Sequence, residues 1–155
     1  MLYILDDTSL NFYLSAIRRH SYKRNKYKVS DSAKRTVDGI VFASRLESRV
    51  YTYLKTVIGK ENFSLQPKYE LQPKFRLNKK AVRAIHYVAD FLVVDGDNEI
   101  VVDAKGMTTP LFKIKEKMFK YRYNKEIVLL KNKKDMRAFA LSLEHIKLKI
   151  KLEDL

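Results

Sequence analysis

Two apolar runs joined by a short polar turn constrain the fold of this chain more than any other feature. Residues 85–94 and 99–104 are largely apolar, and Asp95-Gly96-Asp97-Asn98 separates them. Asp-Gly between such runs is typical of a β-hairpin. Because the runs are apolar on both faces, they should be central strands and not surface strands. The sequence therefore predicts an antiparallel hairpin at the centre of an α/β domain.

Apart from Glu99, which begins the second run, two acids lie within these otherwise apolar runs. A hairpin that pairs Val94 with Glu99 places Asp90 directly opposite Asp103. The Cβ atoms of such a pair are about 5 Å apart, so two carboxylates there repel unless a cation lies between them. Lys105 falls on the same face as Asp103 because strand side chains alternate. The pattern favours Mg²⁺ or Mn²⁺, which prefer hard oxygen ligands.

A structural explanation of the same residues is also open. Asp103 would then form an ion pair with Lys105, and Asp90 would pair with an arginine. The acid-x-Lys spelling does not decide between the two, since 18 acids in so basic a chain should give about two or three such triplets by chance.

The arrangement resembles the PD-(D/E)xK nuclease superfamily, in which an acid in an apolar strand is followed by a short hairpin and an acid-x-Lys triplet. Here the motif is Asp90 and then Asp103-Ala104-Lys105. The superfamily's additional acid usually comes from a preceding helix, and Glu47 has the right order and setting. The resemblance implies a restriction-endonuclease-like core, which is a central mixed β-sheet with an antiparallel hairpin, flanked by helices.

The same resemblance implies metal-assisted hydrolysis of phosphodiester bonds, with Mg²⁺ as cofactor and Mn²⁺ as a substitute. Asp90 and Asp103 would ligate the metal, and the Ala104 carbonyl would be a further ligand. Glu47 would complete the site directly or from its outer shell. Lys105 would orient the nucleophile or stabilise developing negative charge.

Glu47 has a competing structural role. Residues 44–58 are predicted to form a helix with Ser44 as N-cap and Gly59 as its stop. Ser44-Arg-Leu-Glu47 is also the capping-box pattern, in which Glu47 bonds back to the Ser44 backbone. The predicted apolar stripe of this helix comprises Leu46, Val50, Tyr53, Leu54 and Val57.

A wider pattern, over about residues 34–125, is similar to a family of phage-encoded endonucleases, some described as Holliday junction resolvases. Ala89 replaces the proline usual before the first acid, and Gln66 and Gln72 compete for one Gln-Pro position, so neither is assigned a role. This likeness implies branched DNA as substrate, a homodimer, no small-molecule cofactor, and the cytoplasm, that of the host for a phage protein. A nicking or restriction-like nuclease on duplex DNA, and a non-catalytic DNA-binding module, are the alternatives.

The charge of the chain independently indicates a polyanionic partner. Lys and Arg total 32 against 18 Asp and Glu, a net charge of +14. Nucleic acid fits better than a membrane, because no apolar run reaches the length of a spanning helix. With no cysteine and three scattered histidines, zinc sites are disfavoured, so carboxylates must hold any metal.

Two basic segments are predicted to contact the DNA backbone. Residues 18–35 carry eight basic residues and one acid, which indicates a mobile basic arm; a solvated linker is the alternative. With a short helix expected at residues 8–18, this gives an N-terminal unit of residues 1–35 before a nuclease domain of residues 36–155. The candidate phosphate contacts are Arg18, Arg19, Lys23, Arg24, Lys26 and Lys28 in the arm, and Lys113, Lys117, Lys120 and Arg122 beyond the site. For any single lysine of the second group, an ordinary solvated helix face is the alternative.

The remaining elements follow from local signals. The near-repeated pentads at residues 65–69 and 71–75 each contain a proline, which favours an extended or edge segment. Thr109 and Pro110 begin a helix with Leu111, Ile114, Met118 and Tyr121 predicted on its inner face. A strand at residues 126–130 and a helix at 134–143 complete the core, and residues 145–152 fit either a strand or a helical extension.

Overall fold

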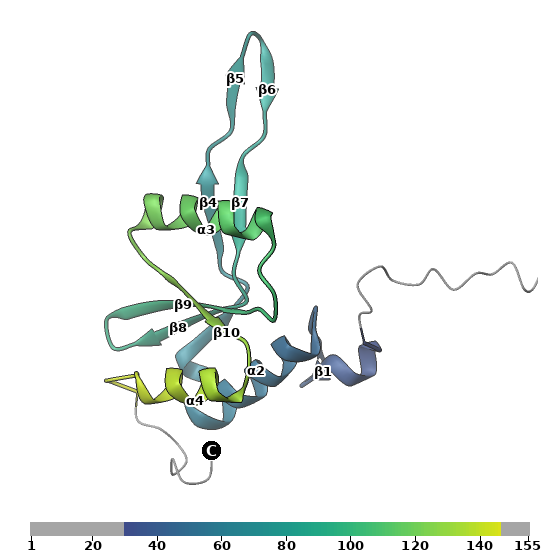
Figure 1. Ribbon diagram of the computed structural model, residues 1–155, viewed down its shortest axis with the longest axis vertical. Helices are drawn as coiled ribbons and strands as arrows, with labels where there is room; N and C mark the ends of the chain where they lie inside the picture. The colour runs from purple at the N-terminus through teal and green to yellow at the C-terminus, as the bar shows by residue number, and fades with distance from the viewer. Residues whose placement is uncertain (1–29, 147–155) are drawn as a thin grey trace, which may run out of the picture.

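The computed structural model describes residues 30–146 and is a mixed α/β fold built around a mixed sheet (Figure 1). Strand β9 is parallel to β10 and antiparallel to β8, and β3 is antiparallel to β8. The four strands, in sheet order, are β10 (Ile127–Leu130), β9 (Asn98–Ala104), β8 (Phe91–Asp95) and β3 (Phe63–Leu65). The sequence-based expectation of a mixed sheet with an antiparallel hairpin is confirmed.

Helices cover both faces of this sheet. Helices α2 (Arg45–Val57) and α4 (Lys133–Leu141) lie on one side, and α3 (Pro110–Tyr123) lies on the other (Figure 1). Strand β9 shows why both faces are apolar: Val102 packs in the cluster with α2 and α4, while Val101 packs in the cluster with α3. Both valines are buried, as expected for a strand between two helical layers.

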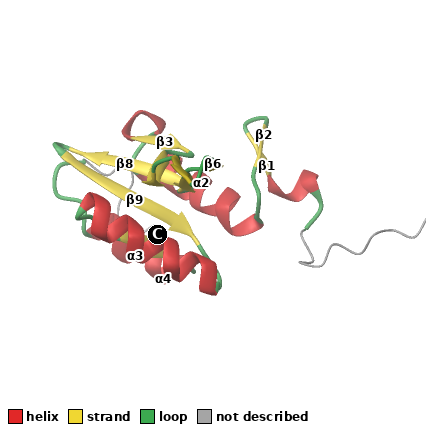
Figure 2. Cartoon of the chain, turned by 90° about the horizontal axis from the view of Figure 1, so that it is seen from above, coloured by secondary structure: helices red, strands yellow, loops and turns green. Residues whose placement is uncertain are grey.

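The central hairpin has the register predicted from the sequence. Val94 pairs with Glu99, and Asp95 pairs with Asn98 around the turn. In Figure 2, β8 and β9 lie side by side as antiparallel arrows. Local turn chemistry was therefore sufficient to align the two strands.

The prediction of one continuous first strand is wrong. Residues 85–94 divide into β7 (Ile85–Val88) and β8, with a break at Ala89-Asp90. Ala89 N–H donates to the Pro67 carbonyl, and the Asp90 carbonyl accepts from Gln66 N–H. These bonds draw the chain away from β9, and β7 pairs with β4 (Lys68–Gln72) in a separate two-stranded ribbon.

The β4–β7 ribbon continues outward as a second hairpin, β5 (Phe75–Leu77) and β6 (Lys80–Val82), which projects from the rest of the fold (Figure 1). Pro67 precedes β4 and Pro73 precedes β5. Both prolines are thus outside the hydrogen-bonded ladders, as the lack of an N–H requires. Most residues of the two pentads are extended as predicted, but Gln66, at the corner between β3 and β4, has a φ of 51°.

Helix α2 has the predicted start. Ser44 is its N-cap, and Val50, Leu54 and Val57 are buried along the predicted stripe. Tyr51, which the prediction left out of the stripe, is buried too. A tight turn at Asp38-Gly39 joins β1 (Thr36–Val37) to β2 (Ile40–Val41) before the helix.

Helix α3 begins at the predicted Thr109 cap and Pro110, but its predicted inner face is wrong. Leu111, Ile114 and Tyr121 are exposed and Met118 is only partly buried, whereas Phe112 and Phe119 are buried. Both sets have helical spacing, so periodicity alone could not choose between them. The aromatic set is buried because the β4–β7 ribbon presents tyrosines to it: Tyr69 and Tyr87 both contact the Phe119 ring edge-on.

At the ends of the described chain, one prediction is corrected, and several others concern residues that the structure does not describe. Residues 32–35, assigned to the mobile arm, form a short 3-10 helix (η1, Ser32–Arg35), and Arg35 donates to the Phe42 carbonyl. The predicted helix at residues 8–18, the rest of the arm and most of the undecided tail lie outside the described residues. No helix among residues 30–146 is long and apolar enough to cross a membrane. A further 3-10 turn, η2 (Lys60–Asn62), links α2 to β3.

Candidate active site

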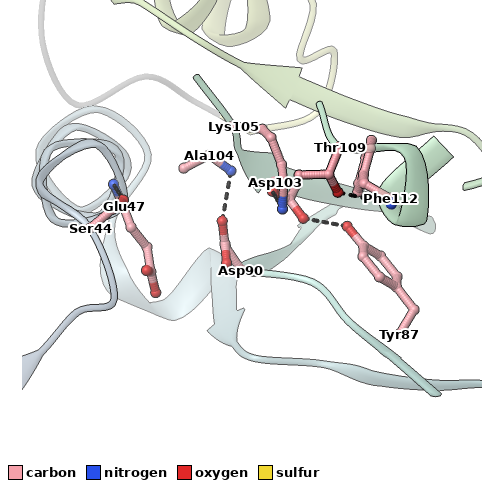
Figure 3. Close-up of polar contacts among 9 residues, drawn as sticks. All are labelled: Ser44, Glu47, Tyr87, Asp90, Asp103, Ala104, Lys105, Thr109 and Phe112. Atoms are coloured by element: carbon pink, nitrogen blue, oxygen red, sulfur yellow. Dashed lines mark hydrogen bonds and ion pairs between the residues drawn. The ribbon is translucent and has the colours of Figure 1, made fainter. Parts of the chain in front are cut away.

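Asp90 and the Asp103–Lys105 segment meet at one end of the β8–β9 hairpin (Figure 3). Asp90 lies just before β8, and its Oδ2 accepts a hydrogen bond of 2.8 Å from the backbone N–H of Ala104. Ala104 is the residue between Asp103 and Lys105. The break before β8 thus turns the Asp90 carboxylate onto the backbone of the acid-x-Lys triplet.

Asp103 is buried, with 2% of its surface exposed. The Tyr87 hydroxyl donates to Asp103 Oδ2 at 2.5 Å, and Lys105 Nζ lies 3.3 Å from Oδ1. The ammonium of Lys105 also lies 4.8 Å from the centre of the Phe112 ring, in cation–π geometry. Asp103 is therefore held between a phenol and an ammonium on one face of β9.

Glu47 approaches from the first turn of α2 and lies beside Asp90 (Figure 3). It is also buried, with 4% exposed. Ser44 Oγ accepts from the Glu47 N–H at 3.1 Å, and Glu47 Oε2 accepts from the Ala43 N–H at 2.9 Å. Glu47 therefore has the structural role of a capping residue, because its carboxylate interacts with the backbone N–H groups of Ala43 and Ser44.

The three carboxylates act on one another electrostatically. The pKa of Asp90 is raised to about 7, first by burial and then by the nearby charges of Asp103 and Glu47, against the opposing Ala104 N–H and Lys105. Burial likewise raises the pKa of Glu47, to which Asp103 also contributes, while backbone N–H groups oppose the shift. The cluster therefore holds more negative charge than its surroundings compensate.

A cation would compensate this excess negative charge, although the described residues form no preassembled metal-binding group. Among residues 30–146, no three His, Cys, Asp or Glu side chains are arranged as a metal-binding group. Mg²⁺, however, keeps several waters and is commonly bound through one or two carboxylates together with substrate phosphate. Asp90 and Asp103 supply two carboxylates, and each carboxylate has about four lone-pair positions, so their present hydrogen bonds leave acceptor capacity.

The purely structural explanation of the two acids required two ion pairs, and the described residues show only one of them. The Asp103–Lys105 ion pair is present, but the described structure gives Asp90 a backbone N–H as its partner and no ion pair with an arginine. A backbone dipole compensates a buried charge less than a guanidinium would.

The predicted DNA-contacting residues of α3 have unequal surroundings. Lys120 pairs with Glu116 and Glu126, and Arg122 pairs with Glu70. Lys113 and Lys117 are exposed and form no ion pair within the described part of the chain. Half of this set is therefore already neutralised by the protein, and the six candidates at Arg18–Lys28 lie outside the described residues.

Two features near the site were missed from the sequence. Tyr87, to which the sequence analysis assigned no role, donates directly to Asp103. The backbone of Gln66-Pro67 brackets Ala89-Asp90, which places the first Gln-Pro pair, and not the second, beside the acids. The repeat itself gave no signal for choosing between them.

A cavity of about 840 Å³ lies elsewhere, lined mainly by α2 and by residues at the start of α4. None of Glu47, Asp90, Asp103 or Lys105 lines it. The chemistry of the carboxylate cluster, and not cavity size, identifies the candidate site.

Comparison with known proteins supplies a family without an activity. No curated protein and no solved structure matches the chain. A family described as "Protein of unknown function (DUF1064)" matches residues 24–138, which include Glu47, Asp90, Asp103 and Lys105. Since the match covers most of the sequence, the chain belongs to the DUF1064 family.

Proposed function

We propose that this protein is a Mg²⁺-dependent DNA endonuclease with a restriction-endonuclease-like core of the PD-(D/E)xK type. The observation that carries the proposal is the contact of the Asp90 carboxylate with the Ala104 N–H, inside the Asp103-Ala104-Lys105 triplet. Asp90, just before β8, thereby meets Asp103 and Lys105, at the end of β9, at one end of the central hairpin. The resemblance noted from the sequence requires this convergence.

Asp90 and Asp103 are the proposed ligands, together with the Ala104 carbonyl, and Glu47 supports them from α2. Mg²⁺ bound there would supply Lewis acidity at the scissile phosphate and neutralise its charge. Tyr87 fixes the rotamer of Asp103 through its hydrogen bond. Lys105, whose side chain is 31% exposed, reaches solvent from the buried acid and is placed to hold a phosphate oxygen or a developing negative charge.

The substrate part of the proposal is branched DNA, and the resolvase-like family is its basis. A junction resolvase makes paired, symmetric cuts, so we propose that the protein acts as a two-fold homodimer. The net charge of +14 supports a nucleic-acid partner, whether branched or linear.

The test is cleavage of a labelled four-way junction and of a linear duplex with matched arms, with and without Mg²⁺. The variants are Asp103→Asn and Lys105→Ala. The matched control is Asp97→Asn, an exposed acid in the turn at the other end of the same hairpin. We expect Mg²⁺-dependent paired cuts in the junction, a loss of at least about 100-fold on removing Lys105, no detectable cutting by Asp103→Asn, and wild-type rates for Asp97→Asn.

The other outcomes separate the alternatives. Equal cutting of junction and duplex would overturn the junction preference and leave a nicking or restriction-like endonuclease. Tight DNA binding without cleavage under Mg²⁺ or Mn²⁺ would overturn the enzyme and leave a DNA-binding module. Equal activity of Asp103→Asn and Asp97→Asn would show that the cluster is not the active site.

A further inference from the structure

The outer hairpin is the most basic part of the described chain without acids of its own. Residues 73–84, here called the basic ribbon, include β5, β6 and the two-residue turn Asn78-Lys79. The ribbon projects beyond the body of the fold at the end of β4 and β7 (Figure 1). Its five basic residues are Lys74, Arg76, Lys79, Lys80 and Arg83, and it has no Asp or Glu.

All five of these side chains are exposed, and none forms an ion pair or side-chain hydrogen bond with another of the described residues. The bases of α3 differ in this respect, since Lys120 and Arg122 are paired with acids. Like charges gathered on a thin ribbon repel one another and need an external anion to compensate them.

The ribbon also lacks a core of its own. Phe75 and Leu77 share one face and are 45% and 61% exposed. Arg76, between them, points to the opposite face because strand side chains alternate. A two-stranded hairpin alone in water is at best marginally stable, so neither face is explained by packing within the described chain.

The turn carries a further basic residue where glycine is usual. Asn78 and Lys79 have φ values of 47° and 65°, as a two-residue hairpin turn of type I′ requires. Glycine would occupy the second position with less strain, yet a lysine stands there. The charge is therefore carried to the very tip of the ribbon.

We propose that the basic ribbon is a DNA-binding arm that enters the major groove next to the cleavage site. The major groove is about 12 Å wide and admits a two-stranded β-ribbon. Five residues on each side of the turn, at about 3.3 Å each, make the arm roughly 17 Å long, more than the groove depth of about 8.5 Å. The basic side chains contact phosphates, while Phe75 and Leu77 face the apolar edges of the bases.

The base of the arm is continuous with the strand that leads to the carboxylate cluster. Strand β7 carries Tyr87, which donates to Asp103, and the chain then passes directly into Asp90. DNA held by the arm therefore lies beside the carboxylate cluster. The inference rests on the proposed nuclease function for its role in cleavage, but DNA binding by the arm is measurable without it.

The experiment compares two triple variants with equal loss of charge. Lys74→Gln/Arg76→Gln/Arg83→Gln removes charge from the arm, and Lys131→Gln/Lys133→Gln/Lys134→Gln removes it from the exposed start of α4. Both are made in the Asp103→Asn background and titrated with duplex and four-way junction DNA over a range of salt concentrations. We expect the arm variant to bind at least about tenfold more weakly and to lose about three units of salt slope, one per phosphate contact. The α4 variant should bind as the background protein does.

Each result bears on one proposal. Equal binding by the two triple variants would overturn the arm, whatever the cleavage assay gives. If only the arm variant loses DNA binding, and the protein with Asp103 intact cuts no DNA, the DNA-binding arm is supported and only the nuclease proposal is overturned. The Phe75→Ala/Leu77→Ala variant tests whether the ribbon instead contacts a second copy of the chain. If this variant converts a dimer to a monomer by sedimentation while DNA affinity is unchanged, the ribbon is a contact between two copies and the DNA arm is overturned.

Discussion

The central hairpin buries an aspartate at its turn and another at its open end, and the protein treats the two in opposite ways. At the turn, Asp95 is 2% exposed and accepts three backbone N–H bonds, from Glu144, His145 and Ile146. At the open end, Asp103 is equally buried but lies near Asp90. Burial alone therefore does not identify a functional acid.

The difference lies in what compensates each charge. Burial would raise the pKa of Asp95, but its three N–H donors together hold that pKa below the ordinary value. At the other end, burial and the neighbouring Asp103 and Glu47 carboxylates outweigh the Ala104 N–H and Lys105, and the pKa of Asp90 rises to about 7. At the turn end, Asp95 is a satisfied structural clamp that holds residues 144–146, whereas the carboxylates at the open end retain uncompensated negative charge.

The largest effect is expected from removing the Asp95 carboxylate at the turn end. Asp95→Ala leaves the three N–H groups of residues 144–146 without their acceptor, and hydrogen bonds to a charged group contribute about 1.5–3 kcal/mol each when well buried. Since these donors are only partly buried, we expect a total loss of about 3 kcal/mol in the free energy of unfolding, measured by urea denaturation. Asp97→Ala in the same turn is the control. A loss no greater than that of Asp97→Ala would mean that Asp95 is not a clamp.

The second prediction acts on the open end with the opposite sign. The pKa of Asp90 is about 7 in the folded chain against 3.8 ordinarily, so the unfolded chain releases its proton first. Stability is therefore lost as pH rises from about 4 to 7, and the loss is complete above that range. Asp90→Asn removes this penalty and should stabilise the metal-free protein by about 2 kcal/mol at pH 8, allowing for partial exposure.

Urea unfolding of wild type and Asp90→Asn from pH 4 to pH 8 measures this effect. The two curves should converge at pH 4 and separate toward pH 8, with Asp97→Asn following wild type. A variant less stable than wild type at pH 8 would show that the Asp90 carboxylate is satisfied as it stands.

Metal addition gives the third prediction. Mg²⁺ at ten times its Kd should stabilise the wild type by about 1.4 kcal/mol, because only the folded chain presents the site. Asp103→Asn should show no such gain, whereas Asp97→Asn should retain it. Thermal unfolding with Mg²⁺ and with EDTA measures the difference. An equal gain in all three proteins would place the binding of Mg²⁺ outside the carboxylate cluster.

The contrast between the two ends also marks how far the sequence could predict this fold. The register of β8 and β9 and the common face of Asp103 and Lys105 follow from turn chemistry and strand alternation, which are local. The break at Ala89-Asp90 depends on hydrogen bonds to Gln66 and Pro67, which come from another part of the chain. No local pattern encodes it.

The other misses have the same cause. Asp95 was explained as a turn residue, because its donors come from about fifty positions further along the chain. The wrong inner face of α3 arose because Phe112 and Phe119 compete with Leu111 and Ile114 at equal spacing, and only the tyrosines of the β4–β7 ribbon decide between them. Sequence patterns give elements and faces, and distant partners determine which face is buried.

The smallest expected effect sharpens the structural assignment of the turn end. Gly96 has a φ of +63°, and a Cβ there would lie 2.8 Å from the His145 ring, in the segment that Asp95 holds. Gly39 has a similar φ of +76° with nothing within 4 Å, so Gly39→Ala reports the backbone strain alone. We expect Gly96→Ala to cost about 1 kcal/mol more than Gly39→Ala in urea unfolding, since His145 must move. His145→Ala should remove that excess if the contact is real, and equal costs for both glycines would mean that residues 144–146 do not pack against the turn.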